Sequence, residues 1–389
     1  MRVLFASTRG AGHFHPLVPF AAACLRAGHE VLVAAPPALS ETVKGAGFSY
    51  WGFDAPPEDE LGEVWSQVPS LPPDEQNALV IREIFGRLNT TASLPRLLEA
   101  CREWRPDVVV REPSEFGSAI AAESHGIPHA RVGNVLAALE TESTRLAAGT
   151  VDALRRSSGL APDPDADVLR SSPYLTVFPA SFEDPEDPAQ PQTLRFSDPA
   201  WAEPPSSAEA PWDAGDGPLV YLTFGSVAGG LEPVAPVYRV ALEAVAGLPV
   251  RVLLTIGREA DPDAFADAPA NVRVESWVPQ AEVLGRAAAV ICHGGAGSTL
   301  GALASGLPLV VVPLFADQPQ NARRVEAVGA GVSVTPDGDP SRIAAEIRDG
   351  VRQVLEDESC RRAAEALAAE MRSQPPADAA VDVLAGLAA

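Results

Sequence analysis

The strongest constraint on the fold of this 389-residue chain is a repeated alternation of short apolar runs with helical segments. In the first repeat, over residues 2–35, two apolar runs flank a glycine-rich turn and a helical segment. Apolar runs without a polar face are typical of strands buried on both sides of a parallel sheet. The pattern therefore predicts an α/β fold, and the length of the chain predicts two domains.

The alternation is interrupted over residues 183–217, which are rich in proline, aspartate, serine and alanine, and it restarts with LVYLTF at 219–224. We predict two doubly wound Rossmann-like domains that face each other across a cleft, with ligands at the carboxyl ends of the strands. The predicted parts are an N-terminal domain over 1–195, a linker over 196–217, a C-terminal domain over 218–372 and a final helix over 373–389 that packs back on the N-terminal domain. We predict a long loop over residues 53–75, and a helix over residues 76–104 that is interrupted near Pro95.

The composition excludes several classes of partner. A formal net charge of −23 argues against binding to nucleic acid or to an anionic membrane surface. The longest apolar run, 302–316, contains Gly306, Pro308 and Pro313, and is too short and too interrupted to cross a bilayer. The N-terminus does not resemble a signal peptide, and the four scattered cysteines suit a reducing compartment, so we expect a cytoplasmic protein.

The stretch 277–321 contains the densest set of candidate ligand-binding residues. An apolar run ends at Cys292, and the glycine-rich segment 293–299 (HGGAGST) then leads into a helical segment. Glycines allow a ligand to approach the backbone, and a helix N-terminus offers free N–H groups with roughly half a positive charge. The segment predicts a phosphate site without a Walker lysine. The alternative is a glycine turn that serves only strand–helix packing.

Two further features lie on either side of this glycine turn. Trp277 follows an expected strand and could stack on a nucleotide base, although a lone tryptophan is more often part of a core. Asp317 and Gln318 offer a carboxylate and an amide to the hydroxyl groups of a sugar. The alternative for Asp317 is the N-cap of the next helix.

The N-terminal half supplies a candidate general base. His13 follows the first expected strand within Gly12-His13-Phe14-His15-Pro16, and a histidine that titrates near neutral pH suits removal of a proton from an attacking hydroxyl. A helix-capping role is the alternative for His13, and His15 is the competing base. Such a base needs an orienting acid, for which Glu112 and Glu115, just after the run DVVVR, both remain candidates.

Several motifs, in one order along the chain, resemble the signature of family 1 glycosyltransferases, which have the GT-B fold. They are G-H-x-x-P at 12–16, T-F-G-S at 223–226, W-V-P-Q at 277–280, H-G-G-A-G-S-T at 293–299 and D-Q-P at 317–319. The resemblance covers nearly the whole chain. It is strongest to the bacterial members that glycosylate polyketides, antibiotics and other secondary metabolites.

The resemblance implies an enzyme that transfers a sugar with inversion and without a metal. His13 would be its general base, and Glu112 would orient His13, where many relatives have aspartate. The N-terminal domain would bind the acceptor and the C-terminal domain the nucleotide sugar. The implied nucleotide-sugar ligands are Ser226, Trp277, Val278, His293, Gly295, Gly297, Ser298, Thr299, Asp317 and Gln318.

One departure from the family pattern bears on the nucleotide. In the UDP-sugar enzymes a glutamate three residues after the conserved serine binds both ribose hydroxyls, and that position here is Gly301. Loss of such a charged hydrogen bond weakens ribose binding by about 1.5–3 kcal/mol. Because a deoxyribose lacks the 2′-hydroxyl, the departure favours a dTDP-sugar over a UDP-sugar. A UDP-sugar-dependent glucosyltransferase and a non-catalytic auxiliary homologue that only binds sugar nucleotides are the alternatives.

The expected acceptor is a hydrophobic small molecule bound by residues 53–100 and 134–172, whose loops are hard to interpret from sequence. Candidate acceptor-binding residues are Trp65, Phe85, Asn134 and Leu136, and packing within helix core is the alternative for the three apolar ones. No cofactor besides the nucleotide sugar and no metal is expected, because the Asp-Pro-Asp strings at 163–165 and 261–263 read as solvated loops. The sugar, the acceptor, the bond type, and any homodimer or activator protein stay open.

Overall fold

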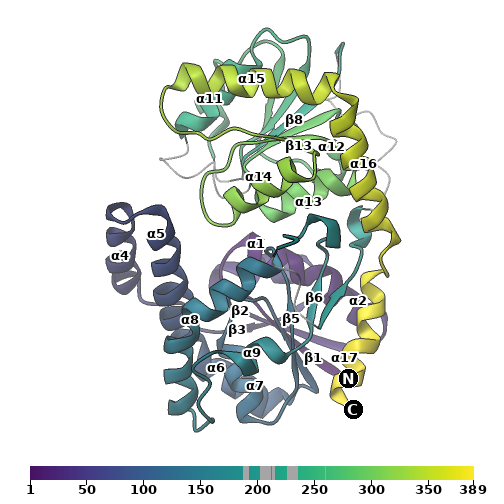
Figure 1. Cartoon of the computed structure of the whole chain (residues 1–389). Helices are drawn as coiled ribbons and strands as arrows, with labels where there is room; N and C mark the ends of the chain where they lie inside the picture. The colour runs from purple at the N-terminus through teal and green to yellow at the C-terminus, as the bar shows by residue number, and fades with distance from the viewer. Residues whose placement is uncertain (187–191, 202–211, 213–214, 226–234, 259) are drawn as a thin grey trace. The chain divides into compact units, whose positions relative to one another are not determined.

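Two parallel β-sheets form the centres of the two units into which the chain divides (Figure 1). The computed structural model describes residues 1–389 except 187–191, 202–211, 213–214, 226–234 and 259. Unit 1 comprises Met1–Phe178, Pro185–Asp198 and Pro375–Ala389, and unit 2 comprises Pro179–Asp184 and Pro199–Gln374. Most of the predicted linker, 196–217, lies outside the described residues.

Within the described residues, unit 1 has a seven-stranded sheet in the order β3-β2-β1-β4-β5-β6-β7, and all its strand pairs are parallel. Its first six positions have the Rossmann order, in which the chain reverses direction across the sheet between β1 and β4. The strands are β1 (Arg2–Ala6), β2 (Glu30–Ala35), β3 (Ser49–Gly52), β4 (Val108–Arg111), β5 (His129–Val132), β6 (Tyr174–Thr176) and β7 (Thr193–Arg195).

Helices connect these strands, and the longest of them is α8. The α-helices of unit 1 are α1 (Ala11–Phe14), α2 (Val18–Arg26), α3 (Ser40–Gly45), α4 (Glu58–Gln67), α5 (Pro73–Leu79), α6 (Thr90–Trp104), α7 (Gly117–Ser124), α8 (Ala137–Ser157), α9 (Asp167–Ser171) and α17 (Ala380–Ala388). Short 3-10 turns are η1 (His15–Leu17), η2 (Pro37–Leu39), η3 (Val68–Ser70) and η10 (Ala377–Ala379). A π-helix, η4 (Val80–Asn89), joins α5 to α6.

The prediction of a long loop over 53–75 is wrong, because α4 and the start of α5 lie there. The first turn of α4 carries Glu58, Asp59 and Glu60, which suit the positive end of the helix dipole, and its Val64 is buried. The predicted interruption near Pro95 is also wrong. Pro95 lies inside α6, which packs against α7 through buried side chains such as Leu97, and this packing outweighs the local preference of proline.

The last helix of the chain belongs to unit 1. Helix α17 packs against α2, beside which it lies in Figure 1. The Arg26 guanidinium donates two hydrogen bonds, each of 2.9 Å, to the Asp378 carboxylate in η10. The backbone of Ser197 also pairs with the segment that leads into η10, since its N–H donates to the Pro375 carbonyl at 2.8 Å.

The described part of unit 2 has a six-stranded parallel sheet in the order β10-β9-β8-β11-β12-β13, again the Rossmann order. Its strands are β8 (Leu219–Thr223), β9 (Arg251–Thr255), β10 (Val272–Glu275), β11 (Ala289–Cys292), β12 (Leu309–Val311) and β13 (Gly331–Ser333). Its α-helices are α11 (Ala235–Val245), α12 (Gln280–Leu284), α13 (Ala296–Ala304), α14 (Gln318–Ala327), α15 (Pro340–Glu356) and α16 (Glu358–Ser373), and its 3-10 turns are η5 (Ala180–Phe182), η6 (Pro199–Trp201) and η9 (Pro262–Phe265).

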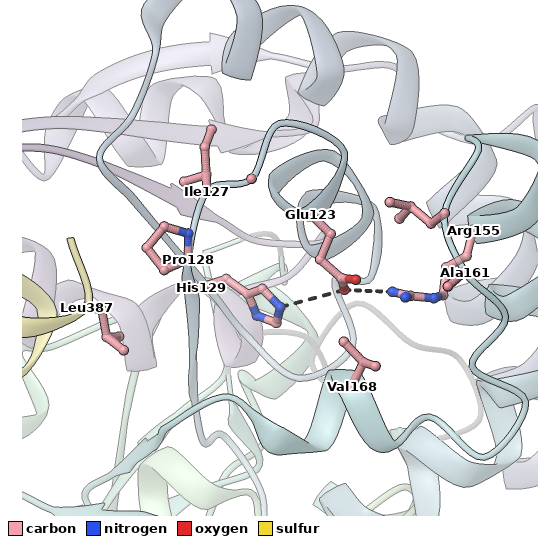
Figure 2. A pocket seen from close by; sticks show the side chains of 10 residues that line it. Glu123, Ile127, Pro128, His129, Arg155, Ala161, Val168 and Leu387 are labelled. Carbon is pink, nitrogen blue, oxygen red and sulfur yellow. Dashed lines mark hydrogen bonds and ion pairs between the residues drawn. The ribbon is translucent and has the colours of Figure 1, made fainter. Parts of the chain in front are cut away.

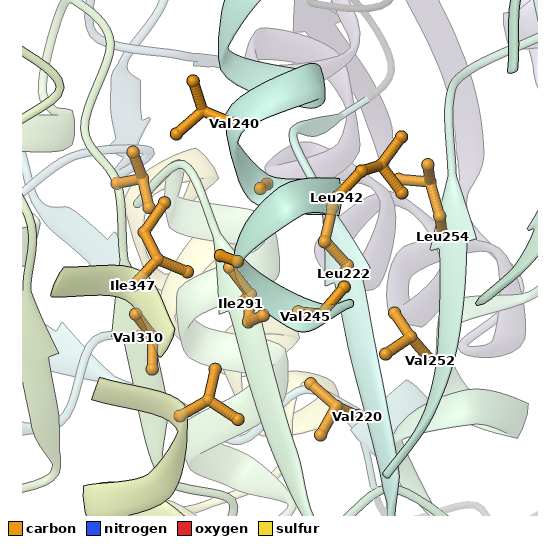
Figure 3. Close-up of a cluster of buried hydrophobic side chains, with 14 of the residues drawn as sticks. Val220, Leu222, Val240, Leu242, Val245, Val252, Leu254, Ile291, Val310 and Ile347 are labelled. Carbon is orange, nitrogen blue, oxygen red and sulfur yellow. The ribbon is translucent and has the colours of Figure 1, made fainter. Parts of the chain in front are cut away.

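Aliphatic side chains fill the space between this sheet and helices α11 and α15 (Figure 3). Val220 and Leu222 of β8 both enter this cluster, as expected for alternate residues of one strand. All five residues of β8 are nevertheless buried, so the opposite face of the strand is covered too. This two-sided burial explains why β8 appears in the sequence as a largely apolar run.

Candidate active site

The carboxyl ends of β1 and β4 meet at the point where the strand order of unit 1 reverses. β1 leads into the one-turn helix α1, which carries His13, and β4 leads directly into Glu112. The turn before α1 contains Gly10 with φ of +118°, a conformation that a residue with a Cβ rarely adopts. The sheet topology therefore brings together two candidate residues that lie far apart in the sequence.

His13 and Glu112 form a close pair, with 3.1 Å between His13 Nδ1 and Glu112 Oε2. The His13 side chain is 23% exposed, whereas the Glu112 side chain is fully buried. The phenyl ring of Phe85, on the π-helix η4, lies against the His13 imidazole with 5.3 Å between the ring centroids. The imidazole is thus held on one nitrogen and on one face.

The Glu112 carboxylate is held by its neighbours as an ionised group. The Thr8 hydroxyl and backbone N–H donate to its Oε1 at 2.7 and 3.1 Å, and the Ser114 N–H donates to its Oε2 at 2.8 Å. Burial on its own would raise the pKa of Glu112, but the facing His13 and these hydrogen bonds together lower it. The sequence did not point to Thr8 as part of the site, because a threonine after a strand carries no distinctive signal.

The competing acid, Glu115, points elsewhere. Its Oε1 accepts from the Gly117 N–H at 3.1 Å and its Oε2 from the Ser118 N–H at 2.9 Å, so it caps the start of α7. Burial raises its pKa. Between the two acids, the structure places only Glu112 in contact with His13 Nδ1. The competing base, His15, lies beside the Phe14 ring at 6.0 Å between centroids.

The four residues expected to bind the acceptor are placed in different environments. Phe85 touches His13, and the Asn134 side-chain nitrogen lies 3.2 Å from His13 Nδ1. Leu136 is buried just before α8, and Trp65 on α4 is 52% exposed. Two of the four residues therefore contact the candidate base itself.

In unit 2 the strand order reverses between β8 and β11, and their carboxyl ends carry the glycine turn. His293 follows β11, and its ring lies between two glycines. A Cβ at Gly295 would lie 2.4 Å from His293 Nε2, and a Cβ at Gly225 would lie 2.9 Å from His293 Cε1. Only glycine fits at either position without moving the ring. Burial lowers the pKa of His293 to about 4, so the ring is neutral at pH 7. Its buried Nδ1 has no hydrogen-bond partner among the residues that the structure describes.

Helix α13 begins directly after this turn, at Ala296. Gly297 is exposed and Ser298 is half-buried, so both are accessible at the first turn of the helix. Thr299 is fully buried, and its N–H donates to the Gly295 carbonyl within the helix. Ser226, the candidate at the end of β8, lies outside the described residues.

Trp277 follows β10 and is 49% exposed. The Arg258 guanidinium, which follows β9, lies over the Trp277 ring, with its Cζ 4.0 Å from the ring centroid. This cation–π contact occupies one face of the indole. Val278, the next residue, is half-buried.

The Asp317 carboxylate does not serve as an N-cap, since it accepts no hydrogen bond from the start of α14. Its Oδ2 instead accepts from the Asn321 side-chain amide at 2.7 Å, and the same amide donates to the Gly294 carbonyl at 2.8 Å. Asn321 therefore ties Asp317 to the glycine turn. The adjacent Gln318 is buried, and its Oε1 accepts from the Leu314 and Phe315 N–H groups at 2.8 and 3.0 Å, so only its amide nitrogen remains for a sugar.

The side chain of Gln280, the first residue of α12, lies against Gly301. A Cβ at Gly301 would lie 3.1 Å both from Gln280 Nε2 and from Leu284 Cδ1. Gln280 Nε2 is buried, and no residue described by the structure forms a hydrogen bond with it. The contact between Gly301 and Gln280 could not be expected from the sequence, because nothing in it relates the two positions.

A hollow of about 600 Å³ in unit 1 lies away from these residues (Figure 2). In it, Glu123 lies between His129 and Arg155, 3.7 Å from His129 Nε2 and 2.6 Å from Arg155 Nη1. His129 is the first residue of β5, so this hollow is at the amino edge of the sheet. The residues around His13 follow the carboxyl ends of the strands, at the opposite edge.

The described residues contain neither a membrane-spanning helix nor a cluster of metal-binding side chains. None of the described helices is both long enough and apolar enough to cross a membrane. Over the same part of the chain, no group of three or more histidine, cysteine, aspartate or glutamate side chains is arranged to hold a metal ion.

Solved structures of glycosyltransferases share the fold of the whole chain. SnogD from Streptomyces nogalater superposes with a TM-score of 0.76 at 25% identity, over 100% of this chain and 99% of SnogD. SsfS6 from Streptomyces sp. SF2575, complexed with thymidine diphosphate, superposes with a TM-score of 0.76 at 25% identity, over 99% of both chains. The fold of the chain is therefore the GT-B fold of glycosyltransferases.

Sequence comparison identifies the family. Sequence models of the N-terminal and C-terminal domains of erythromycin biosynthesis protein CIII-like proteins match residues 22–158 and 239–387. The L-demethylnoviosyl transferase of Streptomyces niveus is 33% identical over 97% of this chain and 100% of its own length. The chain belongs to the erythromycin biosynthesis protein CIII-like family of glycosyltransferases, which confirms the resemblance to bacterial secondary-metabolite enzymes.

Proposed function

We propose that this glycosyltransferase moves a deoxy sugar from a dTDP-sugar to a hydrophobic small-molecule acceptor, with inversion and without a metal. The observation that carries the proposal is the contact of 3.1 Å between His13 and the buried, ionised Glu112 at the strand ends of unit 1. Because Nδ1 faces Glu112, the acceptor is deprotonated by Nε2. Its nucleophilic atom forms the new bond to C1 of the sugar as the bond from C1 to the diphosphate oxygen breaks.

The leaving diphosphate would be stabilised by unit 2. The N-terminus of α13, with the exposed Gly297 and the half-buried Ser298, offers N–H and hydroxyl donors to it. A neutral His293 supplies a further donor without the cost of burying a charge. Asp317 and Gln318 would hold the transferred sugar, and Trp277 with the backbone of Val278 would hold the base. A base on Trp277 takes the face opposite Arg258 or displaces that guanidinium.

Two observations support thymidine over uridine. The similar structure SsfS6 is a complex with thymidine diphosphate. In this chain the space in front of Gly301 is occupied by the Gln280 amide, so a ribose-binding glutamate at 301 would have to displace Gln280. The single neutral amide of Gln280 suffices for a deoxyribose, which has one hydroxyl fewer than ribose.

Two measurements test these assignments. Release of dTDP from dTDP-sugars, measured with and without a panel of hydrophobic aglycones, should depend on the acceptor, and His13→Ala should lower that rate by about 10²–10⁴-fold with dTDP affinity unchanged. Full activity in His13→Ala would remove His13 from the mechanism.

Calorimetric titration should give tighter binding of dTDP than of UDP, and Gly301→Glu should narrow the difference between the two affinities. Tighter binding of UDP by the wild type would contradict the choice of donor.

A further inference from the structure

Three neighbouring strands of unit 1 end around His13. The residue that follows the third strand, Asn134, has no part in the general-base mechanism proposed above. β1, β4 and β5 lie side by side, and their carboxyl ends lead to His13, Glu112 and Asn134. Asn134 Nδ2 lies 3.2 Å from His13 Nδ1, the same ring nitrogen that Glu112 Oε2 approaches to 3.1 Å. One imidazole nitrogen therefore has two polar neighbours.

The chemistry of that nitrogen restricts what both neighbours can do. Facing the ionised Glu112, Nδ1 carries the proton and donates it. A protonated Nδ1 cannot accept a hydrogen bond from the Asn134 amide nitrogen, but it can donate to the amide oxygen. A half-turn about the Cβ–Cγ bond of Asn134 exchanges nitrogen for oxygen at the same place. The lone pair then resides on Nε2, where a proton from the acceptor would be taken up.

The loop that carries Asn134 is anchored to β6 on both sides. The Gly133 N–H donates to the Leu175 carbonyl at 2.8 Å, and the Tyr174 hydroxyl donates to the Val135 carbonyl at 3.1 Å. A Cβ at Gly133 would lie 2.2 Å from the Tyr174 hydroxyl oxygen, so only glycine allows this close approach. Asn134 itself is only 8% exposed, which leaves little of its side chain for an acceptor.

We propose that Asn134 is a positioning residue that accepts the Nδ1 proton of His13 together with Glu112, and so holds the lone pair on Nε2. The inference rests on the proposed function, since it gives Asn134 a role only if His13 is the base. It replaces the acceptor-binding role that the sequence suggested for Asn134.

Steady-state kinetics and nitrogen NMR test the proposal. Asn134→Leu should lower kcat by about 10-fold, the loss expected for one hydrogen bond to a charged group, and leave the KM for the acceptor unchanged. Asn134→Asp keeps an acceptor oxygen in place and should recover most of kcat. In protein with ¹⁵N-labelled histidine, the His13 signals should show a proton on Nδ1 in the wild type and a mixture of tautomers in Asn134→Leu. A raised KM with unchanged kcat, or identical His13 signals in both proteins, would overturn the proposal.

Two further variants keep the result interpretable. If Asn134→Leu does not fold, Asn134→Ser should show the same loss of kcat, and wild-type kcat in that variant would refute the role. Tyr174→Phe removes one anchor of the loop, keeps Asn134, and should give a smaller loss in the same direction. His13→Gln separates this inference from the proposed function. If His13→Gln is active, both the proposed role of His13 as base and the role of Asn134 are wrong. If His13→Gln is inactive but Asn134→Leu is fully active, only the role of Asn134 is wrong.

Discussion

The strand ends of the two units are built on the same sheet topology but hold their histidines in opposite ways. In unit 1, His13 faces a carboxylate whose oxygens also accept from Thr8 and Ser114. In unit 2, His293 lies between Gly225 and Gly295, and its buried Nδ1 has no hydrogen-bond partner within the described part of the chain. One histidine is held by charge and hydrogen bonds, and the other by shape.

The difference matches the two tasks that we propose. A general base needs a fixed tautomer and a neighbour that stabilises its protonated form, and both come from charged and hydrogen-bonding partners. A group that binds a diphosphate needs a donor that is not already occupied, close to a backbone that the ligand can approach. Glycines, together with a ring nitrogen that no described residue hydrogen-bonds, provide that arrangement.

The largest expected effect tests the charged pair of unit 1. Glu112→Gln removes the carboxylate that holds the proton on His13 Nδ1, and turnover should fall by about 10²–10⁴-fold, the range that a general base contributes. Calorimetric affinity for dTDP, which we assign to unit 2, should not change.

Glu115→Gln is the matched control, because Glu115 is an equally buried acid on the same loop but caps α7. It should lower thermal stability and leave turnover within a few-fold of the wild type. An inactive Glu115→Gln beside an active Glu112→Gln would reverse the assignment of the two acids.

A second prediction concerns the histidine held by shape. Because the pKa of His293 is about 4 in the folded protein, the unfolded chain takes up a proton near pH 6.5 that the folded chain does not. Stability should therefore fall as the pH decreases below 6.5, by about 2 kcal/mol between pH 6.5 and 5 from this residue alone. Above pH 6.5 His293 should contribute no pH dependence.

Urea unfolding of the wild type and of His293→Gln at pH 7 and pH 5 measures this contribution. The other histidines and the carboxylates titrate in both proteins and cancel in the comparison. The wild type should lose more stability on acidification than the variant. Equal losses would mean that His293 is not buried as a neutral ring.

The positions of these residues along the chain were predictable, but their partners were not. His13, His293 and Asp317 each follow an apolar run, and the carboxyl end of a parallel strand is where an α/β protein binds ligands. The sequence could not separate Glu112 from Glu115, because both are acids after one strand and only the directions of their side chains differ. For the same reason it did not pair Gln280 with Gly301, since that contact depends on how α12 packs against α13.

The elements that are buried on both faces were predictable from the sequence. The prediction failed for an element that is buried on only one face. The central strands β1, β4, β8 and β11 are largely apolar because both of their faces are buried. Helix α4 was missed because its acidic first turn and a single fully buried residue, Val64, resemble a polar loop. The contact between Asn134 and His13 was not predictable for a related reason: a residue after a strand can face a ligand or a neighbouring side chain, and the strand order decides which side chains are its neighbours.

A third prediction, of an effect comparable to that of His293, concerns the glycines beside this histidine. Gly295→Ala adds a Cβ 2.4 Å from His293 Nε2, and the ring must move to accommodate it. Overpacking of this kind costs about 1–3 kcal/mol, so the unfolding midpoint of unit 2 should fall and dTDP should bind more weakly. Gly297→Ala is the control for stability, since nothing lies within 4 Å of a Cβ there and alanine favours the helix by about 0.5–1 kcal/mol. If Gly295→Ala were as stable as Gly297→Ala, the His293 ring would not be held by shape, and the contrast with His13 would fail. If Gly295→Ala were unstable but bound dTDP normally, the shape would matter for packing alone.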